Sequence, residues 1–199
     1  MLAILAKFVA RPVLSSLLLQ IRPDYRVSMT ERGEQISFDQ MKGTIGGLLM
    51  LWSDIERSLN VAVEALLPGE RARSVRGISR SLDAWSEQVM LGGPDRRLQT
   101  DLCRRLVGML KEALVVRNFV CHGLNGISAQ GGRANVVAHL RVELGDEKRI
   151  ITWHEFQAMF VWMSRGKWLI EDLTAAALEP ELDSSRGKIA AWEGFPKQK

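Results

Sequence analysis

The feature that most constrains this chain is an apolar stripe that recurs every three or four residues along two long stretches. In the stretch from Ile45 to Leu67 it comprises Leu48, Leu51, Trp52, Ile55, Leu59, Ala62, Val63 and Leu66. In the stretch from Leu98 to His122 it comprises Leu98, Leu102, Leu106, Met109, Leu110, Ala113, Val116 and Val120. This spacing places apolar residues on one face of an α-helix. The sequence therefore predicts long helices packed around a shared core.

Glycine and proline residues divide the pattern into separate helices. Pro68-Gly69 ends the first helix, and weaker periodicity from 71 to 91 predicts a second, shorter one. Gly92-Gly93-Pro94 interrupts the chain before the third helix, which is expected to reach Cys121. Gly123 supplies the expected C-terminal stop of that helix.

Two capping boxes place helix starts, because paired side chains satisfy the free backbone amides of a first turn. Ser37 and Gln40 form one before the first helix, and Thr152 and Glu155 form the other before a last helix that ends near Leu178. These signals define the outer limits of the helical domain.

A small β element is expected between the third and last helices. Residues 122–132 are rich in Gly, Asn and Ser and are interpreted as a loop. Residues 135–144 alternate as a strand, 145–147 form a turn, and 149–152 return as the partner strand. The expected fold is mainly α: a helical bundle with a small β-hairpin inserted before the last long helix.

The chain divides into three parts: residues 1–36 as an N-terminal apolar segment and linker, 37–180 as the helical domain, and 181–199 as a C-terminal tail. Only Ile189, Trp192 and Phe195 in the tail are suited to dock onto the domain. No internal repeat divides the chain further.

The N-terminal segment is not expected to insert stably into a membrane. Lys7, Arg11 and Pro12 interrupt it before it reaches the roughly 18 apolar residues that a spanning helix needs. Three interpretations stay open: a loosely attached helix, a start site assigned upstream of a true start at Met29, or a surface helix whose Lys7 and Arg11 meet anionic lipid.

Composition indicates a folded protein of a reducing compartment, for which we expect the cytoplasm. The net charge of +4 is compatible with an RNA partner without requiring one. Cys103 and Cys121 both lie in apolar helical sequence, which disfavours a disulfide scaffold. The sequence lacks phosphate-binding loops, and its histidines and cysteines lack zinc spacing, so we expect neither a metal nor a cofactor.

Candidate chemistry is concentrated at the end of the third helix. Arg117 falls within the apolar face, where an unpaired charge is unfavourable, so its guanidinium needs a polar partner. Asn118 and His122 are four residues apart and share a side, which is expected to bring all three side chains together. A histidine that transfers protons beside an arginine that stabilises phosphate charge suits RNA cleavage without a metal.

A structural role for these residues competes with that hypothesis. Arg117 could pair with an acidic residue of the first helix such as Glu56, while His122 interacts with the free carbonyls of the helix end. The spacing is also not unique, because Arg149 and His154 repeat it. That second pair spans a strand and a helix start and lacks the adjacent asparagine.

Arg117, Asn118 and His122 resemble the hallmark of the HEPN superfamily, an Arg, often followed by Asn, with a His four to six residues later near the end of a long helix. The resemblance implies a helical bundle, a homodimer with the Arg/His pairs facing a shared cleft, and metal-independent endoribonuclease activity. Such domains commonly act as bacterial toxins or defence effectors beside an antitoxin nucleotidyltransferase.

Some members of that superfamily have lost catalysis and bind RNA, nucleotide or protein, which is the alternative function for this chain. The hairpin expected at 135–152 departs from a minimal bundle and leaves the subfamily open.

Overall fold

The structure is a computed structural model that describes residues 38–67, 69–91, 96–130, 137–179 and 183–195. The predictions for residues 1–36, and the capping role of Ser37, lie outside the described residues. None of the helices in the described ranges has the length and apolar character needed to cross a membrane.

The described chain is mainly helical, with one antiparallel sheet inserted before the last long helix, as the sequence predicts. The helices are α2 (Phe38–Leu66), α3 (Glu70–Ser74), α4 (Ile78–Leu91), α5 (Arg96–His122), α6 (Trp153–Leu178) and α7 (Asp183–Ala190). The strands are β1 (Leu124–Gln130), β2 (Val137–Leu144) and β3 (Glu147–Thr152), in the order β1-β2-β3.

Three elements differ from the sequence prediction. The expected second helix is divided into α3 and α4 at Gly77, whose φ of 85° is a conformation that favours glycine. The expected loop at 122–132 contains β1, since pairing with β2 outweighs the poor strand propensity of Gly, Asn and Ser. The C-terminal tail contains α7, although its residues show little helical periodicity.

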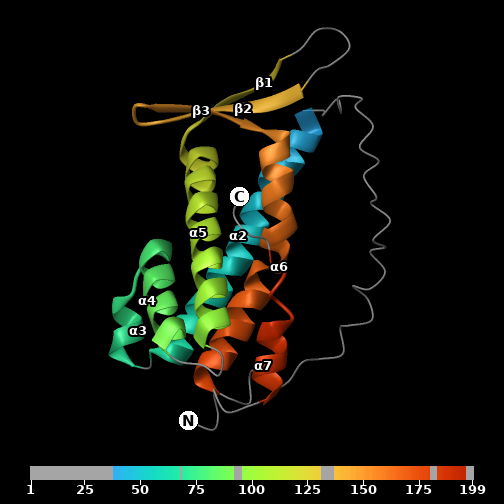
Figure 1. Ribbon diagram of the computed structural model, residues 1–199. Coiled ribbons are helices and arrows are strands. Elements are labelled where there is room, and N and C mark those ends of the chain that lie inside the picture. The colour runs from blue at the N-terminus through green and yellow to red at the C-terminus, as the bar shows by residue number, and fades with distance from the viewer. Residues whose placement is uncertain (1–37, 68, 92–95, 131–136, 180–182, 196–199) are drawn as a thin grey trace. The chain divides into compact units, whose positions relative to one another are not determined.

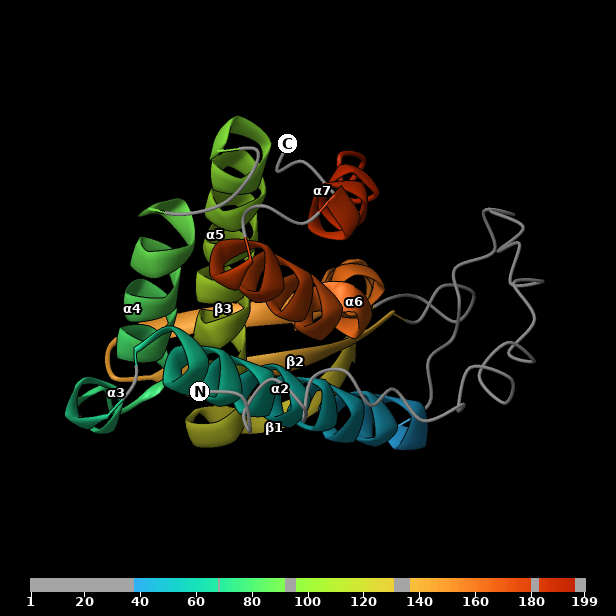
Figure 2. The same cartoon turned by 90° about the horizontal axis from the view of Figure 1, so that it is seen from below.

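The core lies between α2, α4, α5 and α6 (Figure 1). Figure 2 shows α6 between α2 and α7, with α4 and α5 beside them. Trp85 of α4 is fully buried, and its indole Nε1 donates a 2.9 Å hydrogen bond to Thr174 of α6. This bond satisfies a polar group that would otherwise destabilise the interior.

The sheet closes one end of the bundle (Figure 1). Leu140, Val142 and Ile151 point toward the helices and are buried, so the alternate residues of β2 and β3 point outward. A two-residue turn at Gly145-Asp146 joins β2 and β3, and Gly145 has a φ of 62° that favours glycine.

The predicted capping box at the start of α6 is confirmed. Thr152 Oγ1 accepts from the Glu155 amide at 3.3 Å, and the Glu155 carboxylate accepts from the Thr152 amide at 2.6 Å. Arg149 of β3 also binds Glu155 at 2.9 Å. Burial by itself raises the pKa of the Glu155 carboxyl, but hydrogen bonds from Thr152 and Arg149 together hold that pKa below its usual value.

The C-terminal segment docks onto the bundle as predicted, because Ile189 of α7 and Trp192 and Phe195 after it are all buried. The Trp192 indole donates to the Asp172 carboxylate of α6 at 2.9 Å. Arg105 of α5 donates to the Phe195 carbonyl at 2.7 Å. These polar contacts fix the segment to two different helices.

Candidate functional site

The candidate site occupies the last turns of α5, which extend beyond α4 toward the sheet (Figure 1). One side of this helix end faces the core through the buried side chains of Val116, Phe119 and Val120. The other side carries Val115 and His122, which are exposed. The site therefore lies where the bundle ends and the sheet begins.

Arg117 is half-buried on the core side, as its place in the apolar stripe predicts. Its Nη1 donates to Asn118 Oδ1 at 3.1 Å. Its Nε is buried and has no hydrogen-bond partner among the described residues. No acidic side chain of the described ranges pairs with Arg117, so the alternative pairing with Glu56 is not observed.

His122 is the last residue of α5 and is exposed. It shares a side with Asn118, because four residues advance about 40° beyond one helical turn. The His122 side chain points away from that of Arg117, because the Cβ directions of residues five positions apart on an α-helix differ by about 140°. The structure thus joins Arg117 to Asn118, whereas no hydrogen bond within the described chain joins His122 to either.

Three large apolar side chains of α5, β1 and β2 are exposed. Val115 of α5 is 46% exposed, Leu124 at the start of β1 is 41% exposed, and Leu144 at the end of β2 is 38% exposed. We refer to these three residues as the apolar rim. The hairpin of β2 and β3 projects past the end of α5 (Figure 1). The apolar rim is therefore apolar surface that no described residue fully covers.

Gly123 fixes the end of α5 against the sheet. Its amide donates to the Phe119 carbonyl at 2.9 Å, and its carbonyl accepts from the Glu143 amide at 2.6 Å. A Cβ at this position would overlap the backbone carbonyl of Glu143. The helix stops here as predicted, but for a different reason: close approach to β2 requires the glycine, and its φ is not positive.

The second Arg/His pair is arranged differently. Arg149 is bound to Glu155, and His154 is exposed in the first turn of α6. Because Arg149 is bound to Glu155, its guanidinium is not open to a substrate anion. Arg149 and His154 therefore provide a matched control and not a second site.

Comparisons with protein-family models, with curated proteins and with solved structures each give no match for this chain. In the ranges that the structure describes, no group of three His, Cys, Asp or Glu residues is arranged to hold a metal ion. The residues that could carry chemistry at this helix end are Arg117, Asn118 and His122.

A second polar region, not predicted from the sequence, lies on the outer face of the sheet. Arg141 and Lys148 line a hollow there together with Asn125, Glu143 and Ile150. The alternation of β2 contained a signal for it, because charged residues at 141 and 143 alternate with apolar residues at 140 and 142.

Proposed function

We propose that this protein is a metal-independent endoribonuclease of the HEPN type, active as a homodimer. One observation carries the proposal: Arg117 projects from the apolar side of α5, its Nε is buried without a partner, and no described acid neutralises its charge. A guanidinium placed in this way is suited to bind an anionic group, and the RNA phosphodiester provides one.

The three residues have complementary roles. The ribose 2′-oxygen attacks the adjacent phosphorus, the bond from phosphorus to the 5′-oxygen breaks, and the products carry a 2′,3′-cyclic phosphate and a 5′-hydroxyl. His122 accepts the 2′-hydroxyl proton or donates a proton to the leaving 5′-oxygen. Arg117 stabilises the charge that develops on the phosphoryl oxygens. Asn118 accepts from Arg117 and orients its guanidinium.

The dimer follows from the directions of these side chains. Arg117 and His122 diverge on one helix, so a second copy that faces the first could complete each phosphate site. The apolar rim at Val115, Leu124 and Leu144 offers the surface on which that copy would pack. We expect Val115→Glu to yield a monomer in sedimentation velocity and to lose RNA cleavage. A monomeric wild type that cleaves RNA would exclude the dimer.

The cellular role proposed for such an enzyme is that of a toxin or defence effector in the cytoplasm. An antitoxin, for example a nucleotidyltransferase that silences the site, is the expected partner. Co-expression with the neighbouring gene should then relieve any growth arrest that the enzyme causes.

The first experiment incubates labelled single-stranded RNA with the purified wild type and with the His122→Ala and Arg117→Ala variants, in excess chelator. The proposal expects fragments with 2′,3′-cyclic phosphate ends from the wild type, and a loss of at least about 100-fold in each variant. His154→Ala removes an equally exposed histidine of the second pair and should cleave like the wild type. Equal cleavage by wild type and His122→Ala would refute the assigned role.

A non-catalytic RNA-binding module is the second candidate, favoured by the basic side chains on the outer face of the sheet. Under that alternative the wild type binds RNA but leaves it intact over the same incubation.

A further inference from the structure

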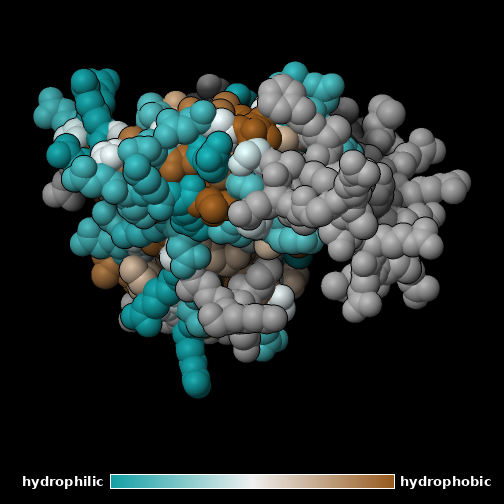
Figure 3. Space-filling view, turned by 90° about the horizontal axis from the view of Figure 1, so that it is seen from above, coloured by the Kyte–Doolittle hydropathy of each residue, from teal (hydrophilic) through white to brown (hydrophobic). Residues whose placement is uncertain are grey.

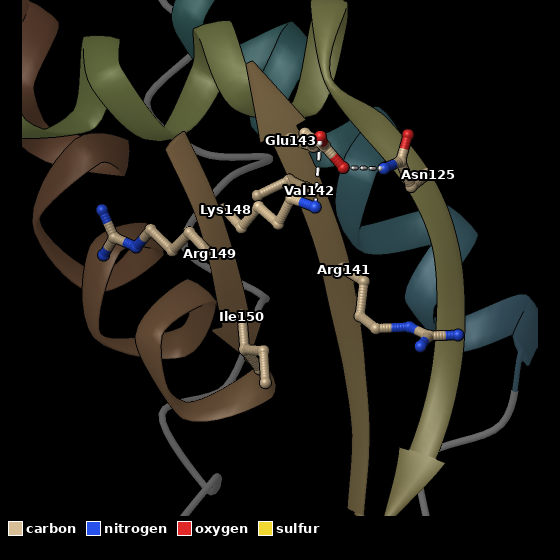
Figure 4. A pocket seen from close by; sticks show the side chains of 7 residues that line it. All are labelled: Asn125, Arg141, Val142, Glu143, Lys148, Arg149 and Ile150. Atoms are coloured by element: carbon tan, nitrogen blue, oxygen red, sulfur yellow. Dashed lines mark hydrogen bonds and ion pairs between the residues drawn. The ribbon is translucent and has the colours of Figure 1, made fainter. Parts of the chain in front are cut away.

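A hollow of about 530 Å³ lies on the outer face of the sheet, on the side away from the helices. Figure 4 shows its lining, which comes from Asn125 of β1, residues 141–143 of β2 and residues 148–150 of β3. Its volume falls within the range of pockets that hold small ligands or one unit of a polymer. Seen from above in Figure 3, the described surface at this end is predominantly hydrophilic.

Arg141, which lines the hollow, pairs with a glycine of the neighbouring strand. Gly126 of β1 is the register partner of Arg141 of β2, and a Cβ at Gly126 would meet no atom within 4 Å. No described side chain therefore covers β1 at Gly126, and the Arg141 side chain extends toward that strand (Figure 4). Arg141 is exposed, and no acidic side chain of the described ranges pairs with it.

Lys148 also lines the hollow, and it is paired with an acidic residue. Lys148 of β3 lies 3.5 Å from the Glu143 carboxylate, which also accepts from the Asn125 amide at 3.0 Å. Ile150 is the register partner of Arg141 on the other side and is 50% exposed. The hollow thus presents the Arg141 guanidinium, which has no acidic partner among the described residues, a loosely paired ammonium, an amide and an exposed apolar side chain in adjacent rows.

We propose that this hollow binds one nucleotide of the single-stranded RNA substrate, with Arg141 and Lys148 on the phosphodiester and Ile150 against the base. The inference rests on the proposed function, since it identifies where that enzyme holds its RNA outside the cleavage site. The combination of cationic and apolar side chains favours a nucleotide over an inorganic anion. The phosphate of a nucleotide needs a cation, and its base needs an adjacent apolar surface.

The position of the hollow is compatible with one RNA strand that reaches both the hollow and the cleavage site. β1 begins two residues after His122, and the Gly123 carbonyl accepts from the amide of Glu143, a residue that lines the hollow. The cleavage site and the hollow are therefore connected through one helix end and one strand pair, without an intervening loop. We expect RNA held on the sheet to continue toward the end of α5, where His122 lies.

The test measures RNA binding in a His122→Ala background, which removes the proposed proton-transfer group and leaves the sheet intact. Arg141→Gln should weaken binding of a short labelled single-stranded RNA by about five- to tenfold. It should also lower the slope of log K against log salt by about 0.7, as expected for one lost phosphate contact. The control Arg104→Gln removes an equally exposed arginine of α5, 18 residues before His122 and so about 27 Å away along the helix.

A second variant changes the sign of the expected effect. Glu143→Gln removes the one negative charge at the hollow and releases Lys148, so it should tighten RNA binding several-fold. Destabilisation of the fold would instead weaken binding, so a gain in affinity cannot arise from a damaged protein.

The outcomes separate the two proposals. Weaker binding by Arg141→Gln together with tighter binding by Glu143→Gln supports the hollow, even if wild type leaves RNA intact and the nuclease proposal fails. Cleavage by wild type with Arg141→Gln and Arg104→Gln binding equally well overturns the hollow while the nuclease stands. No binding of RNA by the wild type or by His122→Ala also overturns the hollow.

Discussion

Replacing Arg117 by Met should stabilise the protein while abolishing RNA cleavage. The unpartnered Nε of Arg117 is buried, and an unsatisfied buried polar group costs about 1 to 3 kcal/mol. The hydrogen bond that this side chain donates to the partly buried Asn118, its one such bond among the described residues, contributes about 0.5 to 1.5 kcal/mol. Methionine keeps an unbranched apolar stem and has a similar helix propensity. The free energy of unfolding should therefore rise by about 1 kcal/mol.

Urea denaturation followed by tryptophan fluorescence measures that change. A gain of about 1 kcal/mol corresponds to a rise of roughly 2 to 4 °C in the melting temperature of a domain of this size. Cleavage of RNA by the same variant should fall by about 100- to 1,000-fold, the usual effect of removing one group that stabilises charge in a transition state.

A loss of 3 kcal/mol or more in Arg117→Met would refute this reasoning, because removal of one partner from a buried ion pair has that magnitude. The guanidinium would then be a structural group. Leu110→Ala provides the calibration, since Leu110 is fully buried on the same helix and its truncation should cost about 2 to 5 kcal/mol.

Three further predictions follow from other parts of the fold. Gly123→Ala should lower the free energy of unfolding by about 2 kcal/mol in urea denaturation, because the added Cβ overlaps the Glu143 carbonyl; an unchanged midpoint would contradict the close approach. The pKa of Glu155 is lowered in the folded protein, so its stabilising effect is present above its ordinary value of 4.5 and is lost as pH falls through the folded pKa. Wild type should therefore exceed Glu155→Gln in stability at neutral pH and lose that advantage in acid; a constant difference from pH 7 to pH 2 would exclude the effect. Burial raises the pKa of the Cys103 thiol to about 12 while Cys121 is exposed, so a thiol reagent should modify Cys121 alone in the native protein and both cysteines after unfolding.

The long helices and the last cap could be predicted because their signals are local. The stripe through Leu48, Trp52, Ile55 and Leu59 is buried throughout, as is the stripe through Leu102, Leu106 and Leu110. The Thr152 cap depends on two side chains three residues apart, so sequence alone specifies it. The inward position of Arg117 followed from the same periodicity.

Elements that depend on distant partners could not be predicted in this way. β1 exists because β2 pairs with it, and Asn125 and Gly126 carry no strand signal of their own. The helix α7 owes its place to contacts of the following residues, such as Trp192 with Asp172 and with Arg165, whose guanidinium lies 4.7 Å from the indole centroid. The hollow on the sheet required knowledge of strand register, which placed Gly126 beside Arg141.

The direct passage from α5 into β1 limits how this protein can vary in length. Only Gly123 separates the two elements, so one residue added between Arg117 and His122 would turn the histidine by about 100° around the helix. One residue added early in β1 would exchange its inner and outer faces. Substitutions at positions other than Gly123 keep the length of both elements, whereas insertions and deletions between Arg117 and Gly126 do not. Related sequences should therefore differ in length elsewhere and keep this interval constant.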